Sequence, residues 1–155
     1  VSNFIFQALV GQNITIYGDG SQTRSFCFVS DMVEGLVRLM DSPAPVLGPM
    51  NLGNPMEYRV SDLAKIVVRL TGSISAIAYS DIPEDDPKRR KPDISAARDV
   101  LGWVPLVPLE DGVLKTVSYF DKCPPKVGTS DLVPSGVILN TDRGHSIKNV
   151  RGICE

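Results

Sequence analysis

The chain has 155 residues, 43% of them hydrophobic and 22% charged, which is typical of one ordinary globular domain with a sizeable core. Its formal net charge of −2 argues against a general affinity for nucleic acid, so anion binding would have to come from a local patch. No apolar run approaches the ~20 residues that span a bilayer, and the chain does not begin with methionine, from which we expect a fragment.

The first 30 residues predict a helix followed by two strands. Residues 1–11 resemble the end of a helix that Gly11 caps. Residues 13–18 and 24–29 are β-branched or aromatic and are predicted as strands. The glycine-rich segment 18–21 joins them as a turn, for which a hairpin is the simplest explanation.

Amphipathic helices dominate the middle of the chain. Ser30 or Asp31 is the predicted N-cap of a helix, and residues 50–55 are predicted as a short strand. Ser61 or Asp62 then opens a second helix. The apolar stripes of these two helices are Val33, Leu36, Val37 and Met40 in the first, and Leu63, Ile66, Val67 and Leu70, before a stop at Gly72, in the second.

The remaining segments complete an alternating pattern. Residues 75–80 are predicted as a strand, 81–93 as a charged loop, 95–102 as a short helix and 108–120 as a last helix with Pro108 in its first turn. The last helix has its apolar side at Leu109, Val113, Val117 and Phe120. Strands alternating with helices predict an α/β fold over residues 1–120, and residues 121–155 are predicted to be an irregular, disordered tail.

Cysteine and histidine give no metal or redox motif. Cys27, Cys123 and Cys154 are odd in number and lack C-x-x-C spacing, which argues against a zinc site or disulfide framework and favours a reducing compartment. The single histidine, His145, is interpreted as a surface residue. We therefore predict no metal site.

Two places combine cationic side chains with turn residues. Arg24 follows the glycine-rich turn, and residues 88–91 read KRRK. Because a guanidinium binds oxyanions in bidentate fashion, Arg24 and one arginine of the run could clamp a diphosphate. Asp93 could then accept from ribose hydroxyls. The aromatic residues near Arg24 that could pack on a base or sugar are Tyr17, Phe26 and Phe28.

Each of these signals has a second interpretation. The KRRK run follows three acidic residues, 84–86, so it also fits a solvated surface, nuclear import or nucleic-acid binding. The sequence GDGSQTR is not the G-x-G-x-x-G fingerprint. The aromatic residues around Arg24 also fit a strand core. These alternatives stay open at the level of single motifs.

Longer motifs resemble a known family. The segments "VSNFIFQALVGQNITIYGDGSQTRSFCFVSDMVEGLVRLM", "NLGNP" and "DDPKRRKPDISAARDVLGWVPLVPLEDGVLKTVSYF" resemble the C-terminal part of an extended short-chain dehydrogenase/reductase, in particular the UDP-glucuronate decarboxylases that form UDP-xylose. The resemblance covers about residues 1–120. It implies the nucleotide-sugar-binding portion of an extended Rossmann-type enzyme whose N-terminal NAD-binding domain is missing here.

The resemblance also implies roles for individual residues in binding a UDP-sugar. Arg24 and Arg90 would bind the phosphates, and Asp93 a ribose hydroxyl. The other implied contacts are Thr15, Ile16 and Tyr17 at the uracil, largely through backbone groups, Phe26 at the ribose or phosphate, Val60 near the base, and Val1 and Phe4 at the uridine.

The catalytic parts of that family are not found in this sequence. None of Tyr17, Tyr58, Tyr79 or Tyr119 begins a Y-x-x-x-K pair, and no Gly-rich NAD fingerprint occurs, so we assign no catalytic or cofactor-binding residue. In the family NAD accepts and returns a hydride at C4 while the C5 carboxylate leaves as CO2, and the tyrosine acts as acid and base. We therefore expect the isolated chain to be inactive.

Alternative functions remain at this point. One is a fragment of dTDP-glucose 4,6-dehydratase or of another nucleotide-sugar epimerase or dehydratase. Others are a non-catalytic nucleotide- or anion-binding module and a basic-loop interaction protein. Family members occur in the cytosol and the Golgi and dimerise through helices mostly outside this stretch, so the sequence decides neither compartment nor assembly.

Overall fold

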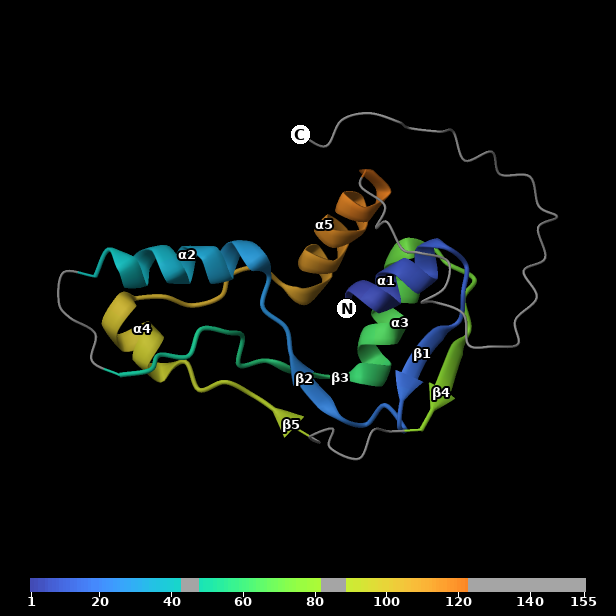
Figure 1. Cartoon of the computed structure of the whole chain (residues 1–155), viewed down its shortest axis with the longest axis horizontal. Coiled ribbons are helices and arrows are strands. Elements are labelled where there is room, and N and C mark those ends of the chain that lie inside the picture. Colours follow the sequence, from blue (N-terminus) through green and yellow to red (C-terminus); the bar gives the residue numbers. More distant parts are fainter. Residues whose placement is uncertain (43–47, 82–88, 123–155) are drawn as a thin grey trace.

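The structure is a computed structural model that describes residues 1–42, 48–81 and 89–122. It confirms the predicted α/β class, with two small sheets and flanking helices (Figure 1). The elements in chain order are α1 (Ser2–Leu9), β1 (Ile14–Tyr17), β2 (Thr23–Ser25), α2 (Val29–Met40), β3 (Glu57–Arg59), α3 (Val60–Thr71), β4 (Ile77–Ser80), β5 (Arg89–Arg90), α4 (Ser95–Leu101) and α5 (Leu109–Lys122).

The hairpin prediction is wrong, because β1 and β2 belong to different sheets. Strand β1 pairs in parallel with β4, whereas β2 is the centre of a sheet with the order β3-β2-β5. The chain after the turn binds the start of α3 instead of folding back on β1. The backbone N–H of Val60 donates to the carbonyl of Gln22 at 3.0 Å, and that of Ser61 to the carbonyl of Gly20 at 3.1 Å.

The hydrophobic core lies where α1, α3 and α5 pack together beside the β1–β4 pair (Figure 1). Burial of these apolar side chains is the main stabilising contribution to the fold. The predicted stripe of the last helix is confirmed, since Val117 and Phe120 also pack against this core. The fully or nearly fully buried members are Ile5, Ala8, Ile14, Ile16, Leu63, Ala64, Val67, Leu109 and Val113.

Helix α1 ends at Gly11 as predicted. The backbone N–H of Gln12 donates to the carbonyl of Gln7 at 2.9 Å, and the backbone N–H of Gly11 donates to the carbonyl of Ala8 at 3.3 Å. This Schellman pattern needs a left-handed residue, and Gly11 has φ +72°. The turn sends the chain directly into β1.

The start of α2 differs from the prediction. The helix begins at Val29 with Phe28 as N-cap, and the preceding strand stops at Ser25, so residues 26–28 are not strand. Asp31 caps no helix but is buried, and its Oδ2 accepts the backbone N–H of Leu106 at 3.0 Å and of Val107 at 2.9 Å. These bonds fasten the segment before α5 to the first turn of α2.

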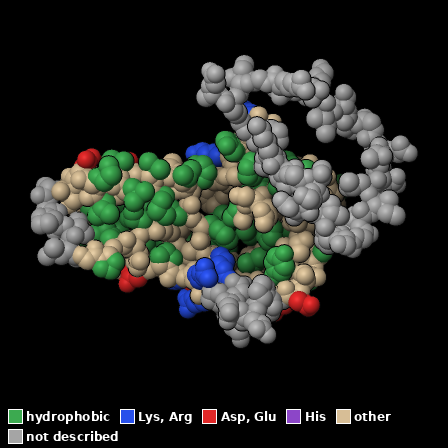
Figure 2. Space-filling view, viewed as in Figure 1, with side chains coloured by type: hydrophobic (Ala, Val, Ile, Leu, Met, Phe, Trp, Pro, Cys, Tyr) green, Lys and Arg blue, Asp and Glu red, His purple; other side chains and the backbone are tan. Residues whose placement is uncertain are grey.

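The apolar stripe of α2 is exposed. Its side chains form part of the hydrophobic surface in the left half of Figure 2. Residues 50–55 beneath α2 are not a strand, contrary to the prediction, since a strand requires a paired neighbour. The exposed fractions of the stripe are 51% at Val33, 49% at Leu36, 42% at Val37 and 78% at Met40.

Smaller corrections concern the chain from α3 onward. Helix α3 begins at Val60, just before the predicted caps, and ends at Gly72 as predicted. Residues 89–90 of the predicted loop form strand β5, while 82–88 lie outside the described residues. Helix α5 continues to Lys122, and the predicted tail beyond it also lies outside them. Within the described ranges no helix has the length and apolar character to cross a membrane.

Candidate functional site

Arg24 and Arg90 lie on adjacent strands. The parallel register of β2 and β5 sets Arg24 directly opposite Arg90. On the other side of β2, Tyr58 of β3 is the antiparallel partner of Arg24. Because directly opposed residues project to the same face of a sheet, Arg24, Tyr58 and Arg90 share one face. The two arginines that the sequence singled out from distant segments are thus neighbours.

The opposite face of this sheet carries a hydrogen-bonded carboxylate. Glu57 Oε1 accepts from Thr23 Oγ1 at 2.8 Å and from Arg89 Nε at 2.8 Å, while Oε2 accepts from Arg89 Nη2 at 2.5 Å. Hydrogen bonds from Arg89 and Thr23 lower the pKa of Glu57 to about 2. One carboxylate therefore connects all three strands.

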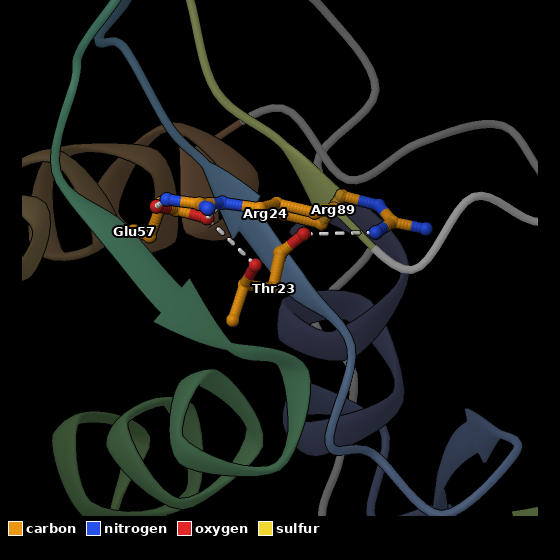
Figure 3. Close-up of polar contacts among 4 residues, drawn as sticks. All are labelled: Thr23, Arg24, Glu57 and Arg89. Carbon is orange, nitrogen blue, oxygen red and sulfur yellow. Dashed lines mark hydrogen bonds and ion pairs between the residues drawn. The ribbon is translucent and has the colours of Figure 1, made fainter.

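The guanidinium groups of Arg24 and Arg89 point in opposite directions (Figure 3). That of Arg89 lies against Glu57, whereas Arg24 Nη1 donates to the carbonyl of Thr23 at 2.8 Å. Arg24 is half-buried and Arg90 is exposed. Positions 24 and 90 therefore place two cationic residues in register on adjacent strands.

The predicted uracil segment lies on β1, and its outward backbone groups already have partners. The Thr15 N–H donates to Gln7 Oε1 at 3.1 Å, and the Tyr17 carbonyl accepts from Gln22 Nε2 at 2.7 Å. The Ile16 side chain is fully buried in the core, so only its backbone is available for the predicted role. Our sequence analysis gave no role to Gln7 and Gln22, because their partners became apparent only in three dimensions.

Two of the predicted uridine contacts meet at one hollow. Val1 and Phe26 line a cavity of about 370 Å³ between the start of α1, the β2–α2 connection and the start of α5. Phe4, Phe26 and Val60 also pack against the same hydrophobic core. Phe28, another of the aromatic candidates, has the ammonium of Lys115 5.2 Å from its ring centre. The cavity and the adjoining core thus bring together α1, the β2–α2 connection, the start of α3 and α5.

Asp93 does not line this cavity. Its Oδ1 accepts from the backbone N–H of Ser95 at 2.9 Å and from Ser95 Oγ at 2.6 Å, and these bonds lower the pKa of Asp93. The residue lines a second hollow with Lys91 and Arg98, apart from the one that contains Val1. Its carboxylate therefore already organises the start of α4.

The described residues do not fit a dinucleotide cofactor. In a dinucleotide-binding turn, a strand leads through glycines into a helix whose N-terminus faces the pyrophosphate. Here the glycine turn after β1 leads into strand β2. We therefore derive no step through NAD from this chain.

Comparison with known proteins identifies relatives. Residues 1–53 match the model of the NAD dependent epimerase/dehydratase family. The chain is 52% identical over 122 residues to UDP-glucuronic acid decarboxylase 1 of Xenopus tropicalis, covering 79% of the chain and 28% of that protein. It is 50% identical over 120 residues to UDP-glucuronic acid decarboxylase 4 of Arabidopsis thaliana, covering 77% and 27%. The chain thus spans less than a third of these relatives.

Solved structures of epimerases share the fold of this chain. An epimerase of Methanothermobacter thermautotrophicus superposes with a TM-score of 0.74 at 31% identity, over 77% of this chain and 36% of that one. The UDP-glucuronic acid 4-epimerase of Bacillus cereus, solved with UDP-glucuronic acid and NAD, gives 0.73 at 27% identity, over 77% and 38%. Over 79% of its length the chain is therefore similar to UDP-glucuronic acid decarboxylase 1, and its residues 1–53 match the NAD dependent epimerase/dehydratase family.

Proposed function

We propose that this chain supplies the nucleotide-sugar diphosphate site of an NAD-dependent UDP-glucuronic acid decarboxylase, which converts UDP-glucuronate to UDP-xylose and CO2. The observation that carries the proposal is the parallel register that sets Arg24 opposite Arg90. Two arginines directly opposed on one sheet face supply two guanidinium groups, each of which can bind a phosphate of a nucleoside diphosphate through paired hydrogen bonds.

In this proposal the chain binds and orients the substrate. Arg24 and Arg90 hold the pyrophosphate, and the β1 segment from Thr15 to Tyr17 approaches the uracil. Phe26, two residues after Arg24 in sequence, borders the ribose. The cavity lined by Val1 and Phe26 receives the uridine end. Asp93 lines the other hollow, so its predicted contact with a ribose hydroxyl requires the ribose to extend beyond this cavity, towards the carboxylate oxygen that Ser95 does not use.

The name of the relatives supports the decarboxylase over the other nucleotide-sugar enzymes considered above. A 4-epimerase with the same fold was solved with UDP-glucuronic acid, so the fold is compatible with this substrate class. Homodimerisation of the full-length enzyme is part of the same proposal, and sedimentation of the full-length protein would test it.

A titration of the chain with UDP tests the binding function. We expect saturable binding that Arg24→Ala and Arg90→Ala each weaken, and that Arg69→Ala leaves unchanged, because Arg69 pairs with Glu110 on the helices α3 and α5. A basic-loop interaction protein would instead bind nucleic acid with a steep salt dependence and without regard to Arg24. Absence of UDP binding in the wild type would refute the proposal.

A further inference from the structure

We propose that Glu57 is a positioning residue that holds Arg89 on one face of the sheet and so fixes Arg90 opposite Arg24 on the other face. This inference rests on the proposed diphosphate site and concerns how that site is assembled. It starts from the carboxylate of Glu57, which binds Thr23 of β2 and Arg89 of β5 on the face opposite to the arginine pair.

Strand β5 has little of its own to determine a register. It consists of two residues paired to β2 along one edge. It also lies within four consecutive basic residues, 88–91, so charge alone does not distinguish one register from the next. Because side chains alternate between faces, a slip of one residue would exchange the faces of every side chain in β5.

The sequence KRRK satisfies both faces in one register only. As observed, Glu57 meets Arg89 and Arg24 faces Arg90. A slip in one direction would give Glu57 a lysine and set Arg89 opposite Arg24. A slip in the other would give Glu57 the guanidinium of Arg90 but set Lys91 opposite Arg24, so only the observed register has an arginine at both positions. Glu57 is bound through Nε and Nη2 of one guanidinium, a two-point contact that a lysine ammonium does not reproduce.

The position of Glu57 suits this role. In the order β3-β2-β5 it sits on one edge strand and holds a side chain of the other, so the bridge passes over β2 (Figure 3). The Thr23 hydroxyl, on the strand between them, donates to the same carboxylate oxygen at 2.8 Å. Holding Arg89 on this face obliges the next residue, Arg90, to project from the other.

The first test reads the register without a ligand. In NMR spectra of the 155-residue chain, we expect cross-strand NOEs between residues 24 and 90 in the wild type and in Glu110→Gln, a control that removes the charge of another arginine-paired carboxylate. Glu57→Gln should lose these NOEs or replace them by NOEs from residue 24 to 89 or 91. Unchanged 24–90 NOEs in Glu57→Gln would overturn the proposal.

The second test separates positioning from general destabilisation. Glu57→Gln should weaken UDP binding about tenfold while leaving the affinity for uridine, which lacks phosphates, unchanged. In an Arg90→Ala background the same substitution should have no further effect on UDP. Equal losses for UDP and uridine, or additive effects, would contradict the role assigned to Glu57. If the wild type bound no UDP, the proposed function would fail, while the NOEs would still decide the register.

Discussion

Trp103 donates its indole N–H to the backbone carbonyl of Asp31 at 2.9 Å, although the two residues are 72 positions apart. Trp103 is 1% exposed and Asp31 is 8% exposed, so the bond is shielded from water. Together with the amides that the Asp31 carboxylate accepts, it joins α2 to the segment that leads into α5. The walls of the cavity lined by Val1 and Phe26 include residues of both segments.

Replacing Asp31 by alanine should destabilise the fold. The backbone amides of Leu106 and Val107 would lose their acceptor, at a cost of about 1–3 kcal/mol in the free energy of unfolding. Urea denaturation followed by Trp103 fluorescence measures the change. Asp99→Ala is the matched control, because Asp99 is exposed and forms its ion pair with its sequence neighbour Arg98. Equal midpoints for the two variants would contradict this role of Asp31.

Gly20 should tolerate alanine less well than Gly11. Both have a positive φ, +75° and +72°, so alanine strains either backbone by roughly 1–2 kcal/mol. A Cβ at Gly20 would also lie 3.0 Å from the Cβ of Ser61, whereas a Cβ at Gly11 would have no atom within 4 Å. The Gly20 variant should therefore show the lower melting temperature. The reverse order would mean that the close approach to α3 is relaxed in solution.

Loss of either clamp arginine should weaken the binding of UDP. Arg24→Ala and Arg90→Ala each remove a charged hydrogen bond, which costs about 1.5–3 kcal/mol and corresponds to roughly a 10–150-fold rise in Kd. Isothermal titration with UDP measures it. If only one of the two substitutions had an effect, the phosphates would be held by a single arginine and the paired geometry would be without consequence for binding.

The titration of Glu57 should depend on Arg89. Its pKa falls from 4.5 to about 2 in the folded chain, so the stabilisation is fully present above about pH 4.5 and is lost as the pH falls towards 2. Side-chain NMR of the wild type should show this low pKa. Arg89→Ala removes the largest cause and should raise it towards 4.5. A low pKa that survives Arg89→Ala would assign the shift to Thr23 or to other charges.

Regular elements with a strong local pattern were predicted well. The stripe and the glycine stop of α3, the strand β1 and the stripe of α5 depend on side chains within one turn or one pleat, and the structure confirms them. Predictions of strands, which depend on pairing with a distant segment of the chain, were less accurate. Residues 50–55 were predicted as a short strand but are not one, and residues 89–90 have the composition of a charged loop but pair with β2.

Asp31 shows why caps were misplaced. A Ser-Asp pair before an apolar stripe is a common N-cap signal, yet the helix starts earlier and Asp31 binds amides that follow it by more than 70 positions. A short carboxylate satisfies backbone donors equally well within its own helix or in another segment. Sequence spacing does not distinguish the two.

The sequence by itself determined the α/β class, the family and the two basic segments from which a diphosphate clamp would come. These follow from composition, periodicity and motifs, which are local properties of the chain. Only the tertiary structure decided that β2 leaves β1 to pair with β3 and β5, and that Arg90, which the resemblance implies as a phosphate contact, lies directly opposite Arg24. Strand register is a property of two segments together, and among four consecutive cations it depends on which one a distant carboxylate binds.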